Sequence, residues 1–142
     1  MSDFPLRKVS RDQMLLKQRV LFVDDDPEAC ALVTKILDDS EVTSAPSFAE
    51  GVCRATSEKF DLILLDQKLL DGTGLDLCSQ IRLFNIATPI LIVTAYHSIT
   101  HEQALAAGGQ GVIRKDHLSQ LLPAAVTHAA ELKFRISGAS PA

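Results

Sequence analysis

The sequence predicts one α/β domain: a five-stranded parallel sheet with helices on both faces. Two observations predict this class. Short apolar runs recur along the chain, and the stretches between them carry apolar residues at helical spacing. Uninterrupted apolar strands are typical of parallel sheets that are covered on both faces. The length of 142 residues is that of a single domain with one core.

Five runs are expected to form the strands. Residues 20–23, 62–65 and 90–93 lack polar alternation and are expected at the centre of the sheet. Residues 42–45 and 111–114 are weaker runs that complete the set. The order along the chain is therefore five repeated strand-helix units, which predicts a three-layer fold.

Helices are expected in the intervals and after the last strand. The apolar residues with helical spacing are Leu32, Val33, Ile36 and Leu37; Phe48, Val52 and Ala55; Leu77, Ile81 and Phe84; Ala104 and Leu105; and Leu118, Leu122, Val126 and Ala129. Pro27 suits a first helical turn, Ser47 and Ser98 are candidate N-caps, and Gly108 follows a helix. The main domain is therefore expected to span residues 19–133.

The flanks carry no chemistry. Residues 1–18 form an N-terminal extension, in which Ser10 and Gln13 have the spacing of a capping box and indicate a short helix. Residues 134–142 are expected to form a C-terminal tail, in which residues 137–142 are small and polar.

Composition excludes several function classes. The chain has 14 Lys plus Arg against 18 Asp plus Glu, so it offers no basic surplus for nucleic acid or an anionic membrane. No apolar run approaches the ~20 residues of a membrane span. Cys30, Cys53 and Cys78 are odd in number and widely spaced, which favours reduced core cysteines over a disulfide or zinc site.

Polar functional groups end the predicted strands. The first strand ends in Asp24, Asp25 and Asp26, the third in Asp66, the fourth in Thr94 and the fifth in Lys115. Functional residues of open parallel sheets gather at these carboxyl ends, near the point where the strand order reverses. With the order 2-1-3-4-5, adopted from known sheets of this kind, the first and third strands are neighbours and their acids meet.

This cluster predicts a metal-assisted phosphorylation site. Three adjacent carboxylates repel each other unless a cation neutralises them, and Mg²⁺ prefers such oxygen ligands while keeping positions open. Beside the ion, Asp66 can attack phosphorus as a nucleophile. Thr94 can donate a hydrogen bond to a phosphoryl oxygen, and Lys115 can supply a positive charge. Asp26, before Pro27, is expected to cap a helix instead.

At this point the sequence resembles a known family, the response-regulator receiver domains. The resemblance covers about residues 19–133 and rests on an ordered set of motifs. They are Val-Leu-Phe-Val-Asp-Asp-Asp-Pro at 20–27, Asp-Leu-Ile-Leu-Leu-Asp at 61–66, Asp-Gly-Thr-Gly at 71–74, Pro-Ile-Leu-Ile-Val-Thr-Ala at 89–95 and Gly-Val-Ile-Arg-Lys at 111–115.

The resemblance implies a flavodoxin-like sheet and a role for each site residue. Asp66 would be the phosphoacceptor, Asp24 and Asp25 would bind Mg²⁺ with Asp66 and the Lys68 main-chain oxygen, and Thr94 and Lys115 would sense the phosphate. Gly74 matches the glycine that closes the loop after the phosphoacceptor.

The function implied is that of a cytoplasmic signalling switch, not a conventional enzyme. A histidine kinase or phosphotransfer protein would be the donor. A downstream effector or attached output domain would read the surface of the fourth helix, fifth strand and fifth helix. Homodimerisation stays open, as does whether the chain is a stand-alone receiver or part of a longer regulator or hybrid kinase.

Three positions depart from the family pattern. Leu70 and Asp116 replace prolines, and Val112 replaces an aromatic residue that turns inward when such domains switch. They motivate an alternative, a pseudo-receiver that binds partners without phosphate. A haloacid dehalogenase-type phosphatase is disfavoured because it needs a second Asp two residues after the nucleophile, where this chain has Lys68. Lys68 and Tyr96 resemble positions that set phosphate lifetime in receivers.

Two histidines have the spacing of possible zinc ligands. His97 and His101 have the required spacing of four residues, but no third ligand accompanies them, so solvated helix positions are expected.

Overall fold

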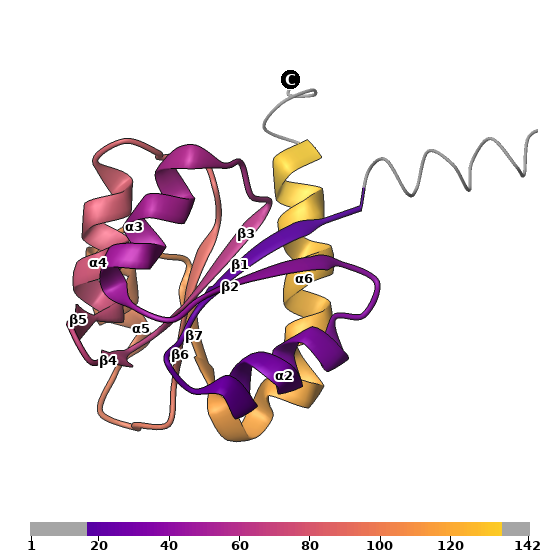
Figure 1. Cartoon of the computed structure of the whole chain (residues 1–142), viewed down its shortest axis with the longest axis horizontal. Helices are drawn as coiled ribbons and strands as arrows, with labels where there is room; N and C mark the ends of the chain where they lie inside the picture. Colours follow the sequence, from indigo (N-terminus) through magenta and orange to yellow (C-terminus); the bar gives the residue numbers. More distant parts are fainter. Residues whose placement is uncertain (1–16, 135–142) are drawn as a thin grey trace, which may run out of the picture.

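A computed structural model describes residues 17–134, which form one parallel sheet between two layers of helices (Figure 1). The strands are β1 (Arg19–Val23), β2 (Glu41–Ala45), β3 (Leu62–Asp66), β6 (Ile90–Thr94) and β7 (Gly111–Arg114). Their spatial order is β2-β1-β3-β6-β7, and every neighbouring pair is parallel. The predicted fold class and the order 2-1-3-4-5 are confirmed.

The helices follow the strands as predicted. They are α2 (Pro27–Ile36), α3 (Phe48–Ser57), α4 (Gly74–Arg82), α5 (His101–Ala106) and α6 (Leu118–Phe134), with a 3₁₀ turn, η1 (Lys115–His117), before α6. In Figure 1, α2 and α6 lie on one side of the sheet, and α3, α4 and α5 lie on the other.

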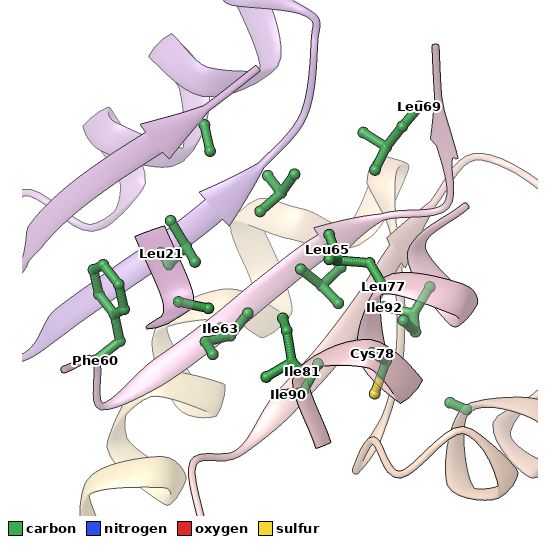
Figure 2. Close-up of a cluster of buried hydrophobic side chains, with 14 residues drawn as sticks. Leu21, Phe60, Ile63, Leu65, Leu69, Leu77, Cys78, Ile81, Ile90 and Ile92 are labelled. Carbon is green, nitrogen blue, oxygen red and sulfur yellow. The ribbon is translucent and has the colours of Figure 1, made fainter. Parts of the chain in front are cut away.

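Two apolar cores result from the alternation of side chains along the strands. In β1, Leu21 and Val23 join the core beneath α3, α4 and α5, while Val20 and Phe22 join the core beneath α2 and α6. Figure 2 shows the first core, in which Leu77, Cys78 and Ile81 of α4 lie over Ile63, Leu65, Ile90 and Ile92. Because β3 is buried on both faces, its carboxyl end is held rigidly.

Helix caps confirm most of the predicted punctuation. Asp26 and Ser47 cap α2 and α3 by accepting hydrogen bonds from the backbone N–H groups of Glu28 and Glu50, and Pro27 is the first residue of α2. The prediction for Ser98 is wrong. Thr100 caps α5, because Gln103 returns its side chain to the Thr100 backbone N–H and completes a capping box there.

Gly108 follows α5 as expected, with a φ of 101°. This left-handed conformation is one that side chains with a Cβ rarely adopt, so glycine terminates the helix there.

A short hairpin was not predicted. The strands β4 (Lys68–Leu69) and β5 (Gly72–Thr73) pair antiparallel around the turn at Leu70 and Asp71. Strands of two residues are too short to show a two-residue alternation, so the pattern analysis missed them.

The structure also bears on the expectations for the cysteines, the N-terminal capping box and membrane spans. Cys30, Cys53 and Cys78 are free, but only Cys78 is a core residue, since Cys30 is half-buried and Cys53 is exposed. The predicted capping box at Ser10 and Gln13 lies outside the described residues. Within residues 17–134, no helix is long and apolar enough to cross a membrane.

Candidate functional site

Three carboxylates converge at the carboxyl ends of β1 and β3. Asp24 and Asp25 follow β1, and Asp66 is the last residue of β3, which pairs with β1 in the sheet. A side-chain oxygen from each lies within 4.8 Å of the other two. Asp24 and Asp66 are buried, whereas Asp25 is half-buried. The adjacency expected of these acids is therefore present.

Lys115 joins this cluster from the far end of the sequence. Its Nζ atom lies 2.9 Å from Asp24 Oδ2 and 3.1 Å from Asp66 Oδ1. The lysine is the residue that follows β7, and its side chain remains 27% exposed. One ammonium group thus bridges the two buried carboxylates.

The positive charge of Lys115 only partly offsets the burial of Asp66 and its repulsion by Asp24. Burial, followed by repulsion from Asp24, raises the pKa of Asp66 to about 6, although Lys115 opposes the rise. Burial alone would lower the pKa of Lys115, but its hydrogen bonds to Asp24 and Asp66 outweigh burial, and its pKa is raised. At neutral pH, both partners are therefore charged.

Asp24 is held by local contacts as well as by Lys115. Its backbone N–H donates to the Ala45 carbonyl at 3.0 Å, and its Oδ1 accepts from the Asp26 backbone N–H at 2.9 Å. Asp26 itself points to the N-terminus of α2, which confirms its interpretation as a cap. The acids of this run therefore divide into Asp24 and Asp25 at the cluster and Asp26 on the helix.

Thr94 and Lys68 lie near the carboxyl ends of two neighbouring strands, β6 and β3. Thr94 ends β6, is fully buried, and accepts a hydrogen bond from the Tyr96 backbone N–H at 2.9 Å. Lys68 begins β4 two residues after Asp66, and its Nζ lies 5.9 Å from the centroid of the Tyr96 ring. The side chains of Lys68 and Tyr96 thus link the loop after Asp66 to the loop after Thr94.

Gly74 is required by a close approach of the backbone. A Cβ atom at this position would lie 2.5 Å from the Asp66 carbonyl oxygen. The Gly74 N–H donates to the Gln67 carbonyl at 3.0 Å, and the Leu75 N–H donates to Gln67 Oε1 at the same distance. The start of α4 is thereby packed directly against the end of β3.

The residues present fit a divalent cation. The cluster has three carboxylates and one lysine, which pairs with Asp24 and Asp66, so two negative charges remain uncompensated. The oxygen donors lie at the ends of two adjacent strands, and Asp25 is half-buried. Carboxylate oxygens are the ligands that Mg²⁺ prefers in proteins. His97 and His101, the alternative metal ligands, are both exposed.

Two residues near the site were missed by the sequence analysis. Asp71 accepts from the backbone N–H groups of Phe48 and Ala49 at 2.8 and 3.1 Å, and these bonds lower its pKa. Arg114 donates to the carbonyls of Tyr96 and His97. Both contacts join segments far apart in the sequence, so no local pattern could have indicated them.

Comparison with known protein families gives one clear match. The family model for the response regulator receiver domain matches residues 20–127.

Two sequence relatives are regulators of greater length. The transcriptional regulatory protein ZraR of Salmonella typhimurium is 32% identical over 130 residues, which are 87% of this chain and 30% of ZraR. The response regulator protein PilR of Pseudomonas aeruginosa is 37% identical over 102 residues, which are 70% of this chain and 23% of PilR. The chain therefore spans less than a third of either relative.

Solved structures agree with the sequence comparison. A receiver domain protein (CheY-like) from Methanospirillum hungatei JF-1 superposes with a TM-score of 0.69 at 27% identity, over 81% of this chain and 98% of that one. A two-component response regulator from Clostridium difficile superposes with a TM-score of 0.75 at 27% identity, over 81% and 97% of the two chains.

Proposed function

This chain belongs to the response regulator receiver domain family, and we propose that Asp66 is its phosphoacceptor in a two-component phosphorelay. The observation that carries the proposal is the cluster in which the Lys115 ammonium group pairs with both buried carboxylates, Asp24 and Asp66. A receiver needs a carboxylate nucleophile beside a cation site and a mobile positive charge. These groups supply all three.

Mg²⁺ is the cation that this proposal requires. Asp24, Asp25 and Asp66 would hold it through side-chain oxygens. The family resemblance adds the main-chain oxygen of Lys68 as a further ligand. When bound, the ion draws negative charge from the phosphoryl group.

The nucleophilic step uses an Asp66 side-chain oxygen. This oxygen forms a bond to phosphorus while the bond from phosphorus to the histidine nitrogen of the kinase breaks, which leaves an acyl phosphate on Asp66. Since Asp66 has a pKa of about 6, it is ionised and nucleophilic at neutral pH. Its burial keeps competing water from most of the carboxylate.

Lys115 and Thr94 respond to the new group. The Lys115 ammonium, already 3.1 Å from Asp66 Oδ1, can pair with a phosphoryl oxygen instead. The Thr94 hydroxyl can donate a hydrogen bond to another such oxygen. Lys115 follows β7 and Thr94 is the register partner of Arg114 in β7, so phosphorylation would shift the population of conformations of the α5, β7 and α6 surface that a partner binds.

The proposal is tested by intact mass spectrometry. Wild type and Asp66→Asn are incubated with a small phosphodonor and Mg²⁺, with an EDTA-treated sample in parallel. We expect one phosphoryl adduct on wild type, and none on Asp66→Asn or without Mg²⁺. An unmodified wild type would contradict the proposal and favour the phosphate-independent pseudo-receiver.

A further inference from the structure

Tyr96 is a junction between three parts of the site. Its backbone N–H donates to Thr94 Oγ1 at 2.9 Å, and its backbone carbonyl accepts from the Arg114 guanidinium. Its ring faces the Lys68 ammonium at 5.9 Å. Movement of Tyr96 would therefore disturb its contacts with Thr94 of β6, with Arg114 of β7 and with Lys68 in the loop after Asp66.

Arg114 of β7 donates hydrogen bonds to the connection between β6 and α5. In addition to Tyr96, its guanidinium donates to the His97 carbonyl at 3.2 Å. Arg114 and Thr94 are direct partners in the register of the two parallel strands. A planar guanidinium can hold two carbonyls at once, which a lysine ammonium does with less geometric constraint.

The strand alternation directs Arg114 to the α5 side of the sheet. Val112, two residues earlier, packs against the core beneath α3, α4 and α5, whereas Ile113 packs on the other side. Side chains two residues apart share a face, so Arg114 lies on the face of Val112. Lys115, the next residue, reaches the carboxylates instead.

We propose that Arg114 is a positioning residue that transmits the state of the Thr94 hydroxyl to the β6–α5 connection. This inference rests on the proposed phosphorylation of Asp66. When Thr94 turns to donate to a phosphoryl oxygen, the Tyr96 N–H that is bonded to it must follow or lose its partner. Because Arg114 holds the carbonyl of the same residue, the displacement passes to His97 and to α5.

Val112 offers no comparable link. Its side chain is aliphatic and half-buried, and it has no atom that can hydrogen-bond to the connection. Arg114 therefore supplies a polar path from Thr94 to the surface in a chain that has no aromatic side chain at Val112.

The first experiment tests the contact itself, without phosphate. Tyr96 is the only tyrosine and the chain has no tryptophan, so fluorine NMR of 3-fluorotyrosine reports on this position alone. We expect Arg114→Ala to shift the fluorine resonance and to speed hydrogen exchange of the Tyr96 amide about tenfold, because the Tyr96 and His97 carbonyls lose their guanidinium donor. The control, Arg54→Ala, removes an arginine from the remote helix α3 and should change neither. Unchanged exchange and resonance in Arg114→Ala would overturn the proposal.

The second experiment tests transmission. Wild type, Arg114→Ala and Arg114→Lys are treated with a small phosphodonor and Mg²⁺, and the adduct is measured by intact mass. We expect equal adduct formation, since Arg114 does not touch Asp66, but a phosphorylation-induced shift of the His97 and α5 amide resonances that is smaller by roughly half or more in both variants. A merely structural arginine would leave that shift at its wild-type size, which would overturn the proposal.

The two failures can be told apart. If wild type forms no adduct, the proposed phosphorylation is wrong and transmission by Arg114 falls with it, while the first experiment still shows whether the contact exists. If wild type forms the adduct and the variants shift as wild type does, only the role of Arg114 is wrong.

Discussion

The Lys115 ammonium lies 3.1 Å from Asp66 Oδ1, so the proposed phosphoacceptor is already paired with a cation in the unmodified protein. The same ammonium is shared with Asp24, and the pKa of Asp66 is still raised to about 6. The site therefore holds more negative charge than it neutralises.

The first prediction concerns stability and pH. The pKa of Asp66 is higher in the folded chain than its ordinary value of 3.8, so the folded state binds more protons between these values and its stability falls as the pH rises through about 6. Asp66→Asn cannot ionise. It should raise the free energy of unfolding of the metal-free protein at neutral pH by up to ~3 kcal/mol, a figure that already includes the favourable pairing of Asp66 with Lys115.

Urea unfolding in EDTA at several pH values measures this difference. The gain should shrink as the pH is lowered from 7 toward 3.8, because Asp66 then becomes protonated in the folded wild type, and it should vanish below 3.8, where Asp66 is protonated in both states. Asp39→Asn, which changes an exposed acid, is the control. A gain that is independent of pH would show that charge on Asp66 is not its cause.

The second prediction concerns Mg²⁺ binding. The ion should stabilise the folded protein by ~2.7 kcal/mol at about a hundredfold excess over its dissociation constant. Asp25→Asn should abolish most of this effect. Asp26→Asn should retain it, since Asp26 caps α2 and Asn is an equally good cap. Thermal unfolding over a Mg²⁺ titration compares the variants, and equal losses in both would assign the ion elsewhere.

The third prediction concerns Gly74. In Gly74→Ala, the new Cβ would lie 2.5 Å from the Asp66 carbonyl oxygen, so the backbone must move. We expect a loss of ~1–3 kcal/mol in the free energy of unfolding and slower adduct formation on Asp66. Gly111→Ala is the control, because its closest contacts are 3.3 Å away on the exposed side chain of His101. Full stability of Gly74→Ala would contradict the close approach.

The fourth prediction concerns Lys68 and Tyr96, which we infer to influence the lifetime of the phosphate as one unit. Because the ammonium faces the ring, Lys68→Ala and Tyr96→Ala should each change the dephosphorylation rate about two- to fivefold in the same direction. The double variant should change it no further than the larger single effect. Lys35→Ala, on the exposed surface of α2, should have no effect. Independent, multiplying effects would exclude the pair as a unit.

The three central strands could be predicted from the sequence because each is a mostly buried apolar run, whereas the edge strands β2 and β7 are weaker runs. Residues 62–65, for example, are apolar without interruption and are buried on both faces in β3. The strand order was adopted from known sheets, and that order brings Asp24 next to Asp66. Periodicity alone does not determine which strands are neighbours.

Local ambiguity accounts for the wrong N-cap. Ser98 and Thr100 are both good capping residues, and only the Gln103 side chain, three residues after Thr100, distinguishes them. That signal was present in the sequence and could have decided the choice.

Other contacts could not have been predicted. Arg114 with Tyr96, and Asp71 with Phe48, are pairs whose meeting depends on how separate loops pack. The distances from Lys115 to the two carboxylates likewise exist only in the folded chain.

The most direct test of the account is to locate the phosphoryl group. Borohydride reduces an acyl phosphate on an Asp side chain to an alcohol, which converts that residue to homoserine. After treatment with a phosphodonor and Mg²⁺, reduction and peptide sequencing by mass spectrometry should find homoserine at position 66 alone. Homoserine at Asp24 or Asp25 instead, or at no position, would contradict the assignment of Asp66 as the phosphoacceptor.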